Sequence, residues 1–312
     1  MMRLGAHNSI AGGYHNAVAE AVSIGGDCFQ MFCKNQRQWA AKPLLADEVH
    51  QFRDAVAKAK TAPIMVHDSY LINMGNADKE KARQSRDAFL HEYERSEALG
   101  AAYLNFHPGS HNSEDKKVRD DVKTRVAALE RVCANVAEVL DATKGFHCRL
   151  VIENAAGQGT NVGNSWEEVG FMLDTVGQKK RMGVTIDTQH SWASGYNWVE
   201  GYDEVWDSFQ SAVGLDNLVA FHLNDSKTEC GARVDRHDTI GSGLLGLEFF
   251  RMLMNDRRLD SKAGYLETPD GPEGWKKELA LLRSLRGEAS GDRPRASAKK
   301  VAKAAKPKQS TL

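Results

Sequence analysis

Short apolar runs alternate with longer amphipathic segments along most of the chain, and this alternation restricts the possible folds more than any other feature of the sequence. The runs are rich in β-branched and aromatic residues, which is typical of buried strands. Strands that are apolar on both faces and are separated by helices indicate a parallel sheet covered by helices. Eight such runs precede residue 286, at 3–7, 27–32, 63–67, 102–107, 149–153, 183–187, 219–223 and 264–267.

The segments between the runs have the spacing of helices. One helix should end at Gly100, because glycine readily adopts the left-handed conformation that closes a helix. Eight strand–helix units predict an α/β fold, a (β/α)8 TIM barrel in a single domain, although a doubly wound open sheet has the same alternation. The clearest helical stripe steps by three and four residues through Val118, Val122, Val126, Leu129, Cys133, Val136 and Leu140.

Composition changes near the C-terminal end. Residues 287–312 are rich in Gly, Ser, Pro, Ala and Lys, and such a segment cannot bury enough apolar surface to fold. We expect residues 1–286 to form the barrel domain and residues 287–312 to form a disordered tail. Seven Lys and Arg residues and no acid lie within 293–312, so this segment carries +7 and the remaining chain −8, for a net charge of −1.

Cysteine usage and hydropathy indicate the compartment. The five cysteines are an odd number without C-x-x-C spacing, which favours reduced thiols over a disulfide framework. No run approaches the roughly 18 apolar residues of a membrane span, and the first residues lack the apolar core of a signal peptide. We expect no membrane partner and a place in the cytoplasm or nucleoid of a prokaryote. In a eukaryote the basic tail would be compatible with nuclear import.

The ends of the apolar runs carry the candidate chemistry, because catalytic side chains of a TIM barrel lie at the C-terminal ends of its strands. A buried carboxylate costs several kcal/mol unless it is paired or bound to a cation, so acids after apolar runs indicate a metal site. Imidazoles and carboxylates without thiolates favour Zn, Mn, Fe or Co. Seven of the eight runs have a potential ligand as their last or penultimate residue: His7, His67, His107, Glu153, Asp187, His222 and Glu267.

Two loops add further potential ligands. His190 follows Asp187 by three residues, and Asp235 and His237 are spaced so that both side chains lie on one side of an extended segment. This many ligands indicates more than one ion. A lone histidine beside an apolar run is often a hydrogen-bonded core residue, and for His7 the roles of ligand and of a residue that orients a ligand both stay open.

Three other features have alternative explanations. Gly241, Gly243 and Gly246 spell G-x-G-x-x-G, but no buried strand precedes them, so we reject a dinucleotide site. Ser110 and His111 are adjacent, but nothing orients them as a nucleophile pair. The loops after the second and third runs contain Arg37, Tyr70 and Leu71. These residues suit a wedge that enters a DNA groove, and ordinary packing on the barrel rim explains them equally well.

The chain resembles the endonuclease IV family of apurinic/apyrimidinic endonucleases from residue 2 to about residue 286, in GAHNSIAGG, KNQRQW, HDSYLIN, LNFHPGSH, VIENAAGQG, IDTQH, HLNDSK, RVDRH and LET. The resemblance implies a (β/α)8 barrel with three Zn²⁺ ions that hydrolyses duplex DNA on the 5′ side of abasic sites. The implied products are a 3′-hydroxyl and a 5′-deoxyribose phosphate, and the removal of blocked 3′ ends is implied as well. The expected partner is duplex DNA with abasic sites, and the expected state is a monomer.

The resemblance also assigns roles to residues. The first zinc would be held by His67, His107 and Glu153. Glu153 would bridge to a second zinc, held also by Asp187, His222 and Glu267. The third would be held by His190, Asp235 and His237. Glu153 and Glu267 are assigned as catalytic, His7 and Asn224 as residues that orient ligands, and Lys34, Arg37, Tyr70, Leu71 and Arg233 as DNA contacts.

The sequence departs from the family pattern at three positions near these ligands. Gln189 stands where a cysteine is frequent, Trp192 where smaller residues are frequent, and Asp238 where another histidine occurs.

Two other functions compete with DNA cleavage. A sugar isomerase or epimerase with a related barrel also places acids and histidines at strand ends, but needs neither a third metal nor a wedge. A non-catalytic binder of damaged DNA would tolerate the loss of ligands, and none is lost.

Overall fold

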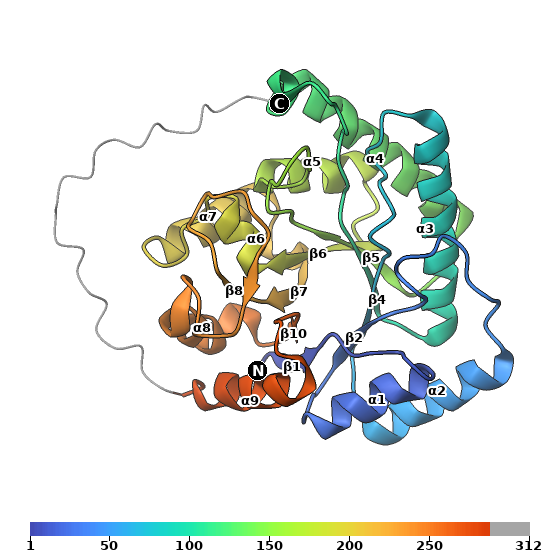
Figure 1. The fold of residues 1–312 in the computed structure, drawn as a ribbon, viewed down its shortest axis with the longest axis vertical. Helices are drawn as coiled ribbons and strands as arrows, with labels where there is room; N and C mark the ends of the chain where they lie inside the picture. Colours follow the sequence, from blue (N-terminus) through green and yellow to red (C-terminus); the bar gives the residue numbers. More distant parts are fainter. Residues whose placement is uncertain (288–312) are drawn as a thin grey trace.

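The structure is a computed structural model and describes residues 1–287. Eight parallel strands form the centre of the molecule and helices surround them (Figure 1). The strands are β1 (Arg3–Ala6), β2 (Phe29–Phe32), β3 (Ile64–His67), β4 (Tyr103–Phe106), β5 (Arg149–Glu153), β6 (Met182–Asp187), β7 (Leu218–Leu223) and β10 (Ala263–Leu266). Each of the eight predicted runs contains one of these strands or most of it, which confirms the predicted alternation.

The strands are paired in the order β1-β10-β7-β6-β5-β4-β3-β2. Strands β1 and β2, at the two ends of this order, also meet. His7 forms a parallel bridge with Gln30, Asn8 N donates to Gln30 O at 2.7 Å, and Asp27 N donates to Leu4 O at 2.7 Å. These contacts close the sheet into a barrel, so the predicted TIM barrel is confirmed and the open sheet is excluded.

The helices are α1 (Tyr14–Ser23), α2 (Ala46–Ala59), α3 (Lys79–Leu99), α4 (Val122–Ala142), α5 (Trp166–Val176), α6 (Thr188–Ala193), α7 (Tyr202–Ala212), α8 (Gly246–Asn255) and α9 (Gly271–Ser284). Short 3-10 turns occur at Lys116–Val118, Leu215–Asn217 and Arg257–Leu259. Two-residue strands β8 (Asp225–Ser226) and β9 (His237–Asp238) follow β7 in the sequence and form an antiparallel pair. Within residues 1–287, every helix is too short or too polar to cross a bilayer.

Helix ends follow their local sequences. Gly100 has a φ of 77° and closes α3, as predicted. The predicted stripe along α4 is correct only from Leu129 onward. The Asp121 carboxylate accepts from Thr124 N and begins α4 at Val122, which is 43% exposed, and Val118 belongs to a separate 3-10 turn.

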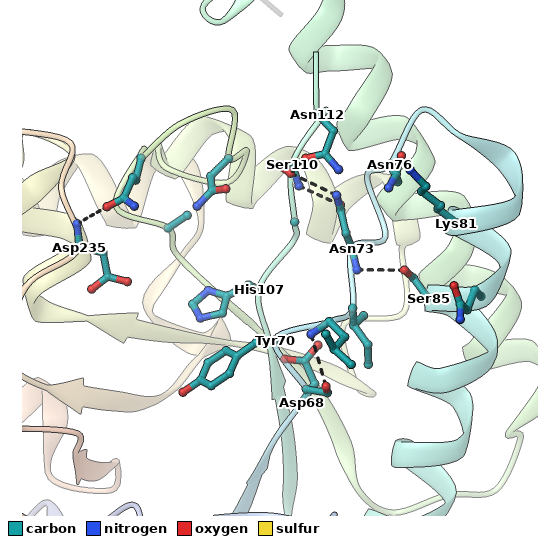
Figure 2. A pocket seen from close by; sticks show the side chains of 18 of the residues that line it. Asp68, Tyr70, Asn73, Asn76, Lys81, Ser85, His107, Ser110, Asn112 and Asp235 are labelled. Atoms are coloured by element: carbon teal, nitrogen blue, oxygen red, sulfur yellow. Dashed lines mark hydrogen bonds between the residues drawn. The ribbon is translucent and has the colours of Figure 1, made fainter. Parts of the chain in front are cut away.

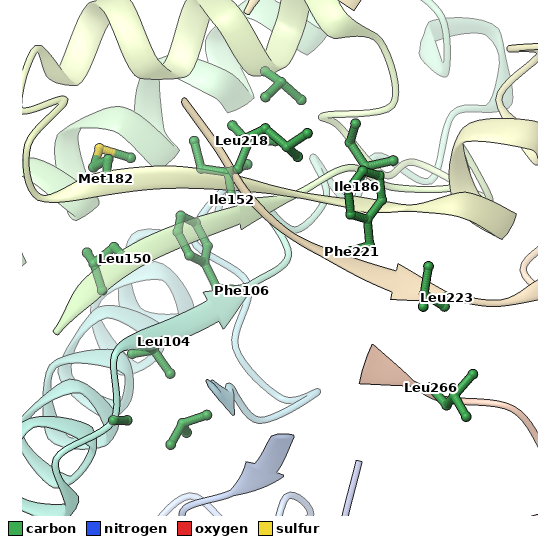
Figure 3. Packing of buried hydrophobic residues seen from close by; sticks show 14 of the residues in the cluster. Leu104, Phe106, Leu150, Ile152, Met182, Ile186, Leu218, Phe221, Leu223 and Leu266 are labelled. Carbon is green, nitrogen blue, oxygen red and sulfur yellow. The ribbon is translucent and has the colours of Figure 1, made fainter. Parts of the chain in front are cut away.

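Side chains alternate between the two sides of the barrel wall, and this alternation positions the site. Residues that point outward pack under the helices as one large apolar core, shown for β4, β5, β6, β7 and β10 in Figure 3. Residues that point inward form a separate small cluster, which includes Met65, Val151 and Tyr265. Nearer the C-terminal ends of the strands the inward residues are polar and buried: Gln30, Asn105, Glu153, Thr185, Asp187 and His222. The predicted tail lies outside the described residues, apart from Gly287.

Candidate metal centre

The side chains predicted as metal ligands converge at the C-terminal end of the barrel. They come from β3, β5, β6, β7, α6, the loops after β4 and β10, the loop between β8 and β9, and the start of β9. In each of three sets the potential ligand atoms all lie within 4.8 Å of one another. The sets are His67, His107 and Glu153; Glu153, Asp187, His222 and Glu267; and Asp187, His190 and His237.

Glu153 lies at the centre of this group and is fully buried. Its Oε2 is 3.4 Å from His67 Nε2 and 3.5 Å from His107 Nε2. Its Oε1 is 2.9 Å from His222 Nδ1 and 3.2 Å from His190 Nδ1. One carboxylate oxygen therefore faces the first set and the other faces the second, as expected for a carboxylate that serves two sites.

Asp235 completes the third set from the loop between β8 and β9. Its Oδ2 is 3.4 Å from His190 Nε2, and its Oδ1 is 3.4 Å from His237 Nε2. Asp187 also approaches this set, with Oδ2 3.6 Å from His237 Nε2. The Asp235 side chain is half exposed, whereas Asp187 is buried, so this set opens toward solvent.

The donor set fits metal ions. Two ligand atoms bound to one tetrahedral zinc at about 2.1 Å lie about 3.4 Å apart, close to most of the separations above. Buried atoms that face one another across the sets have no hydrogen-bond partner within residues 1–287, which is unusual for polar atoms of a folded protein. These atoms are Glu153 Oε1, His190 Nε2, His222 Nδ1 and His237 Nε2.

Electrostatics supports the same conclusion. Burial raises the pKa of Glu153, but His107 and His222 outweigh this effect and hold the pKa well below its ordinary value. Burial lowers the pKa of His190, but Asp187 and Asp235 outweigh it and hold the pKa well above its ordinary value. The buried carboxylates therefore need positive charge beside them, and bound cations supply it without protonating the imidazoles.

Each of four histidines has a partner on the ring nitrogen opposite the one that would bind a metal, which is the usual arrangement around metals. His67 Nδ1 lies 2.8 Å from Asp68 O, and His237 Nδ1 lies 3.3 Å from Glu267 O. The other two pairs are His222 Nε2 with Gln30 Oε1 at 2.7 Å and His190 Nδ1 with Asn154 O at 3.0 Å.

His7 and Asn224 also lie where orienting residues would be. His7 Nδ1 is 3.3 Å from Glu267 Oε1. The Asn224 amide donates to Asp187 Oδ2 at 2.8 Å and accepts from Glu267 N at 3.2 Å. Both residues therefore contact proposed ligands of the second set.

Sequence reasoning missed two residues of this group. The fully buried Gln30 amide donates to Glu267 Oε1 at 2.6 Å, and Asn105 donates to Glu153 Oε2 at 2.6 Å. The available signal was a single amide inside an otherwise apolar run, in FQMF and YLNF. An amide buried in a strand needs polar partners, and in a barrel those partners lie at the site.

The predicted wedge residues lie beside the metal centre. Tyr70 is 68% exposed, and its ring packs edge-on against Phe32 at 5.6 Å. Arg37 is exposed and Leu71 is half-buried. Figure 2 shows Tyr70, His107 and Asp235 at one end of a cavity of about 640 Å³, with Lys81 toward the other end.

The structure corrects the prediction for Lys34, which was expected to contact DNA. Its side chain is only 2% exposed, and Nζ lies 3.0 Å from Glu92 Oε1. A lysine buried in this way cannot reach a ligand on the surface. Arg233 remains partly exposed on the rim, where its guanidinium pairs with Asp120 at 2.7 Å.

The glycine motif binds a carboxylate of the chain itself. The buried Asp225 side chain accepts from the backbone N–H groups of Gly241 at 2.9 Å, Gly243 at 3.1 Å and Leu245 at 2.9 Å. A Cβ on Gly243 would lie 2.6 Å from Asp225 Oδ1, so this glycine permits the close approach. The loop therefore fixes the residue next to Asn224, and no phosphate is needed to explain it.

Ser110 and His111 do not form a nucleophile pair. Ser110 Oγ accepts from Asn73 Nδ2 at 3.1 Å and also bonds Asn112 Oδ1. His111 Nδ1 accepts from Ser113 N at 3.2 Å, and its Nε2 faces a backbone carbonyl. Both side chains are engaged in holding their loops.

Comparison with known proteins gives consistent results. The sequence profile of a family described as "Xylose isomerase-like TIM barrel" matches residues 18–285. A protein named "Probable endonuclease 4" from Phocaeicola vulgatus is 45% identical over 91% of this chain and 99% of its own length. The crystal structure of endonuclease IV from Thermus thermophilus is 33% identical, has a TM-score of 0.79, and covers 91% of this chain and 98% of its own.

The same fold occurs in a sugar epimerase-like protein. The crystal structure of a D-tagatose 3-epimerase-like protein has a TM-score of 0.65 over 91% of this chain and 97% of its own, but it is only 14% identical. That likeness concerns the fold alone, because one barrel architecture carries many chemistries.

Proposed function

The chain belongs to the endonuclease IV family, and from this membership we propose that it is a DNA repair hydrolase that cleaves the phosphodiester 5′ to an abasic site in duplex DNA. The products would be a 3′-hydroxyl and a 5′-deoxyribose phosphate, and blocked 3′ ends would also be removed. The observation that carries the proposal is the convergence of three sets of acids and histidines around Glu153 at the mouth of the barrel.

We propose three zinc ions per chain. The first would be held by His67, His107 and Glu153. The second would be held by Glu153, Asp187, His222 and Glu267. The third would be held by His190, Asp235 and His237, with Asp187 close by. When bound, such ions lower the pKa of coordinated water toward about 7 and neutralise the charge of a phosphodiester.

The chain's own residues would hold the ligands in place and keep their protonation fixed. Gln30 spans Glu267 and His222, since its amide donates to one at 2.6 Å and accepts from the other at 2.7 Å. Asn105 donates to Glu153 Oε2, so this oxygen keeps its orientation. Side chains fixed in this way need little rearrangement when a phosphate arrives, and such preorganisation is a main source of catalytic rate.

Substrate selection would use the exposed side chains beside the centre. Arg37, Tyr70 and Leu71 would enter the duplex and fill the space left by an extruded nucleotide. A nucleotide without its base has lost stacking and pairing, so its extrusion costs less than that of a normal nucleotide. The cavity of about 640 Å³, which has Tyr70, His107 and Asp235 at one end, would then receive the sugar-phosphate.

Two features favour this function over an epimerase of the same fold. The third set, with His190, Asp235 and His237, exceeds the requirements of a sugar epimerase, and the exposed Tyr70 suits a wedge that enters DNA. A binder without catalysis would not need the complete set of ligands.

We propose further that the active form is a monomer, because all proposed ligands come from one chain, and that residues 1–286 form the catalytic domain. An enzyme with this substrate works on chromosomal DNA, which in a bacterium lies in the nucleoid.

The test is an incision assay on a duplex with one synthetic abasic site. We expect one cut on its 5′ side, no cut in the undamaged duplex, and loss of cleavage after prolonged chelation. A Glu153→Ala, His107→Ala double variant should lose cleavage while its barrel stays folded by circular dichroism. Unchanged cleavage by that variant would contradict the proposal, and turnover of a ketohexose without DNA cleavage would favour the epimerase.

A further inference from the structure

The loop between β8 and β9 carries Asp235, yet Cys230 is the one side chain of the described loop that packs against the apolar core, and it is only partly buried. None of residues 227–239 is buried. A segment with few buried apolar contacts depends on hydrogen bonds for a defined position. The helix beside it is α6, which carries His190, and α6 lies next to β8 in Figure 1.

The end of α6 is closed by this loop. The last carbonyls of a helix have no partners within the helix, and here the loop supplies them. Gly231 N donates to Trp192 O at 3.0 Å, and Arg233 N donates to Ala193 O at 2.9 Å. The Trp192 indole donates to Thr228 O at 2.8 Å. Several bonds therefore tie the middle of the loop to α6.

Gln189 binds the loop at the peptide that precedes Asp235. Its side chain is 0% exposed. Its Nε2 donates to Val234 O at 3.0 Å and to Ser226 Oγ at 3.3 Å. Within the described residues, the other amide atom, Oε1, has no hydrogen-bond partner. An unpaired buried carbonyl disfavours folding, so the presence of Gln189 at this position is not explained by good packing in the core. It is explained by the hydrogen bonds that its Nε2 donates.

Two consecutive residues of α6 therefore contact two adjacent residues of the loop. Side chains of neighbouring helical residues project about 100° apart, so Gln189 reaches Val234 while His190 Nε2 faces Asp235 Oδ2 at 3.4 Å. Both contacts depend on the same register between helix and loop. A loop that shifted would move Asp235 away from His190.

We infer that Gln189 is a positioning residue for the third metal: it fixes the backbone at Val234 and thereby the Asp235 carboxylate opposite His190. The inference rests on the proposed metal centre and concerns one of the positions at which this chain departs from its family pattern. Loss of a residue that orients a ligand typically weakens metal binding about 10- to 100-fold. The effect should be confined to one of the three ions, because the hydrogen bonds of Gln189 go to the loop and to Ser226 and not to the other two sets.

The experiment counts zinc per chain in the purified holoprotein after equilibration with increasing chelator. Gln189→Met keeps a side chain of similar length but has no donor. Asn255→Ala is the matched control, because it removes an amide that donates to Leu285 O at 2.8 Å, away from the metals. We expect Gln189→Met to lose one ion at a free zinc concentration about 10- to 100-fold higher than wild type does, and to keep the other two as wild type and Asn255→Ala do.

Three results would overturn the inference. One is a chelation profile of Gln189→Met equal to that of wild type. Another is parallel loss of all three ions, which would indicate a general packing role. The third is a wild type that never holds a third ion, which would refute the three-metal site itself and is therefore distinguishable from a failure of Gln189 alone. If Gln189→Met does not fold, Gln189→Leu, which also lacks a donor and adds no charge, must show the same selective loss.

Discussion

Lys34 and Glu92 form a buried ion pair, with 3.0 Å between Nζ and Oε1, and the pair supports the loop that carries Tyr70. The other carboxylate oxygen of Glu92 accepts from Ser69 N at 3.0 Å, and Ser69 immediately precedes Tyr70. Lys34 was expected to contact DNA, but it is buried and instead holds Glu92, which binds the backbone just before Tyr70. Its contribution to substrate binding would be indirect, through the position of Tyr70.

Lys34→Met should destabilise the protein, because it leaves the Glu92 carboxylate buried without its partner. Breaking a buried pair from one side typically costs about 3–5 kcal/mol. The double variant Lys34→Met, Glu92→Met should recover part of this loss, since no unpaired charge remains but Ser69 N loses its acceptor. Urea unfolding of wild type, Lys34→Met, Glu92→Met and the double variant measures the interaction free energy between Lys34 and Glu92. Equal stability of wild type and Lys34→Met would show that the pair is not closed in solution.

The stability of Lys34→Met should also depend on pH. Burial raises the pKa of Glu92 even though Lys34 lies beside it. A carboxyl whose pKa is higher in the folded chain than in the unfolded chain destabilises the fold at high pH. The full penalty applies above the folded pKa, where the carboxyl is ionised in both the folded and the unfolded state. This penalty disappears as the pH falls through the folded pKa toward the unfolded value of about 4.3. Relative to wild type, Lys34→Met should therefore regain stability as the pH is lowered from neutrality toward the ordinary pKa of a glutamic acid, and a constant difference would contradict this explanation.

Gln30→Leu should lower activity and metal retention while the barrel stays folded. The amide touches Glu267, His7 and His222, so its removal frees two proposed ligands of the second set. We expect about 10- to 100-fold weaker binding of the affected metal and a fall in kcat. Metal analysis after mild chelation, together with incision kinetics, checks both effects. Wild-type metal content and kcat in a folded variant would show that Gln30 is only a packing residue.

Asp225→Ala should destabilise the end of the barrel, because it leaves the N–H groups of Gly241, Gly243 and Leu245 without their acceptor. An unsatisfied buried donor costs about 1–3 kcal/mol, and of these three residues Leu245 is the buried one. Gly243→Ala should act similarly, since its Cβ would lie 2.5 Å from Ser226 O. Asp54→Ala is a suitable control, because that carboxylate is 70% exposed. Thermal unfolding midpoints near wild type for Asp225→Ala would refute the role of the carboxylate.

Tyr70→Ala should impair incision of duplex DNA more than incision of single strands. The side chain is 68% exposed, so its loss should barely change the stability of the protein. An aromatic side chain stacked on a base contributes about 1–3 kcal/mol, and this contribution is needed only where a duplex must be opened. The ratio of kcat/KM for an abasic duplex to that for an abasic single strand should fall about 5- to 160-fold. An equal fall on both substrates would contradict the wedge.

Much of the fold and the convergence of the site could be predicted because both depend on short-range pattern. Apolar runs indicated the strands, and the rule that strand ends meet at one mouth indicated the neighbours of Glu153. The burial of Lys34 was not predictable, because its partner Glu92 lies far along the chain on α3. Gln30 was missed for a similar reason. Its role is set by Glu267 and His222, which become its neighbours only when the barrel closes.

Removal of residues 287–312 should weaken DNA binding in a salt-dependent way without changing the cleavage site. Arg286 donates to the carbonyl of Met2, just before β1, so the described chain ends at the opposite end of the barrel from the proposed metal sites. Seven positive charges follow within 293–312, while the rest of the chain carries −8. Each phosphate that a cation neutralises adds about 0.9 to the slope of log affinity against log salt. A chain ending at Arg286 should therefore show a shallower slope on undamaged duplex, and its kcat on saturating abasic substrate should equal that of the full chain. An identical slope for both chains would show that the basic segment does not contact DNA.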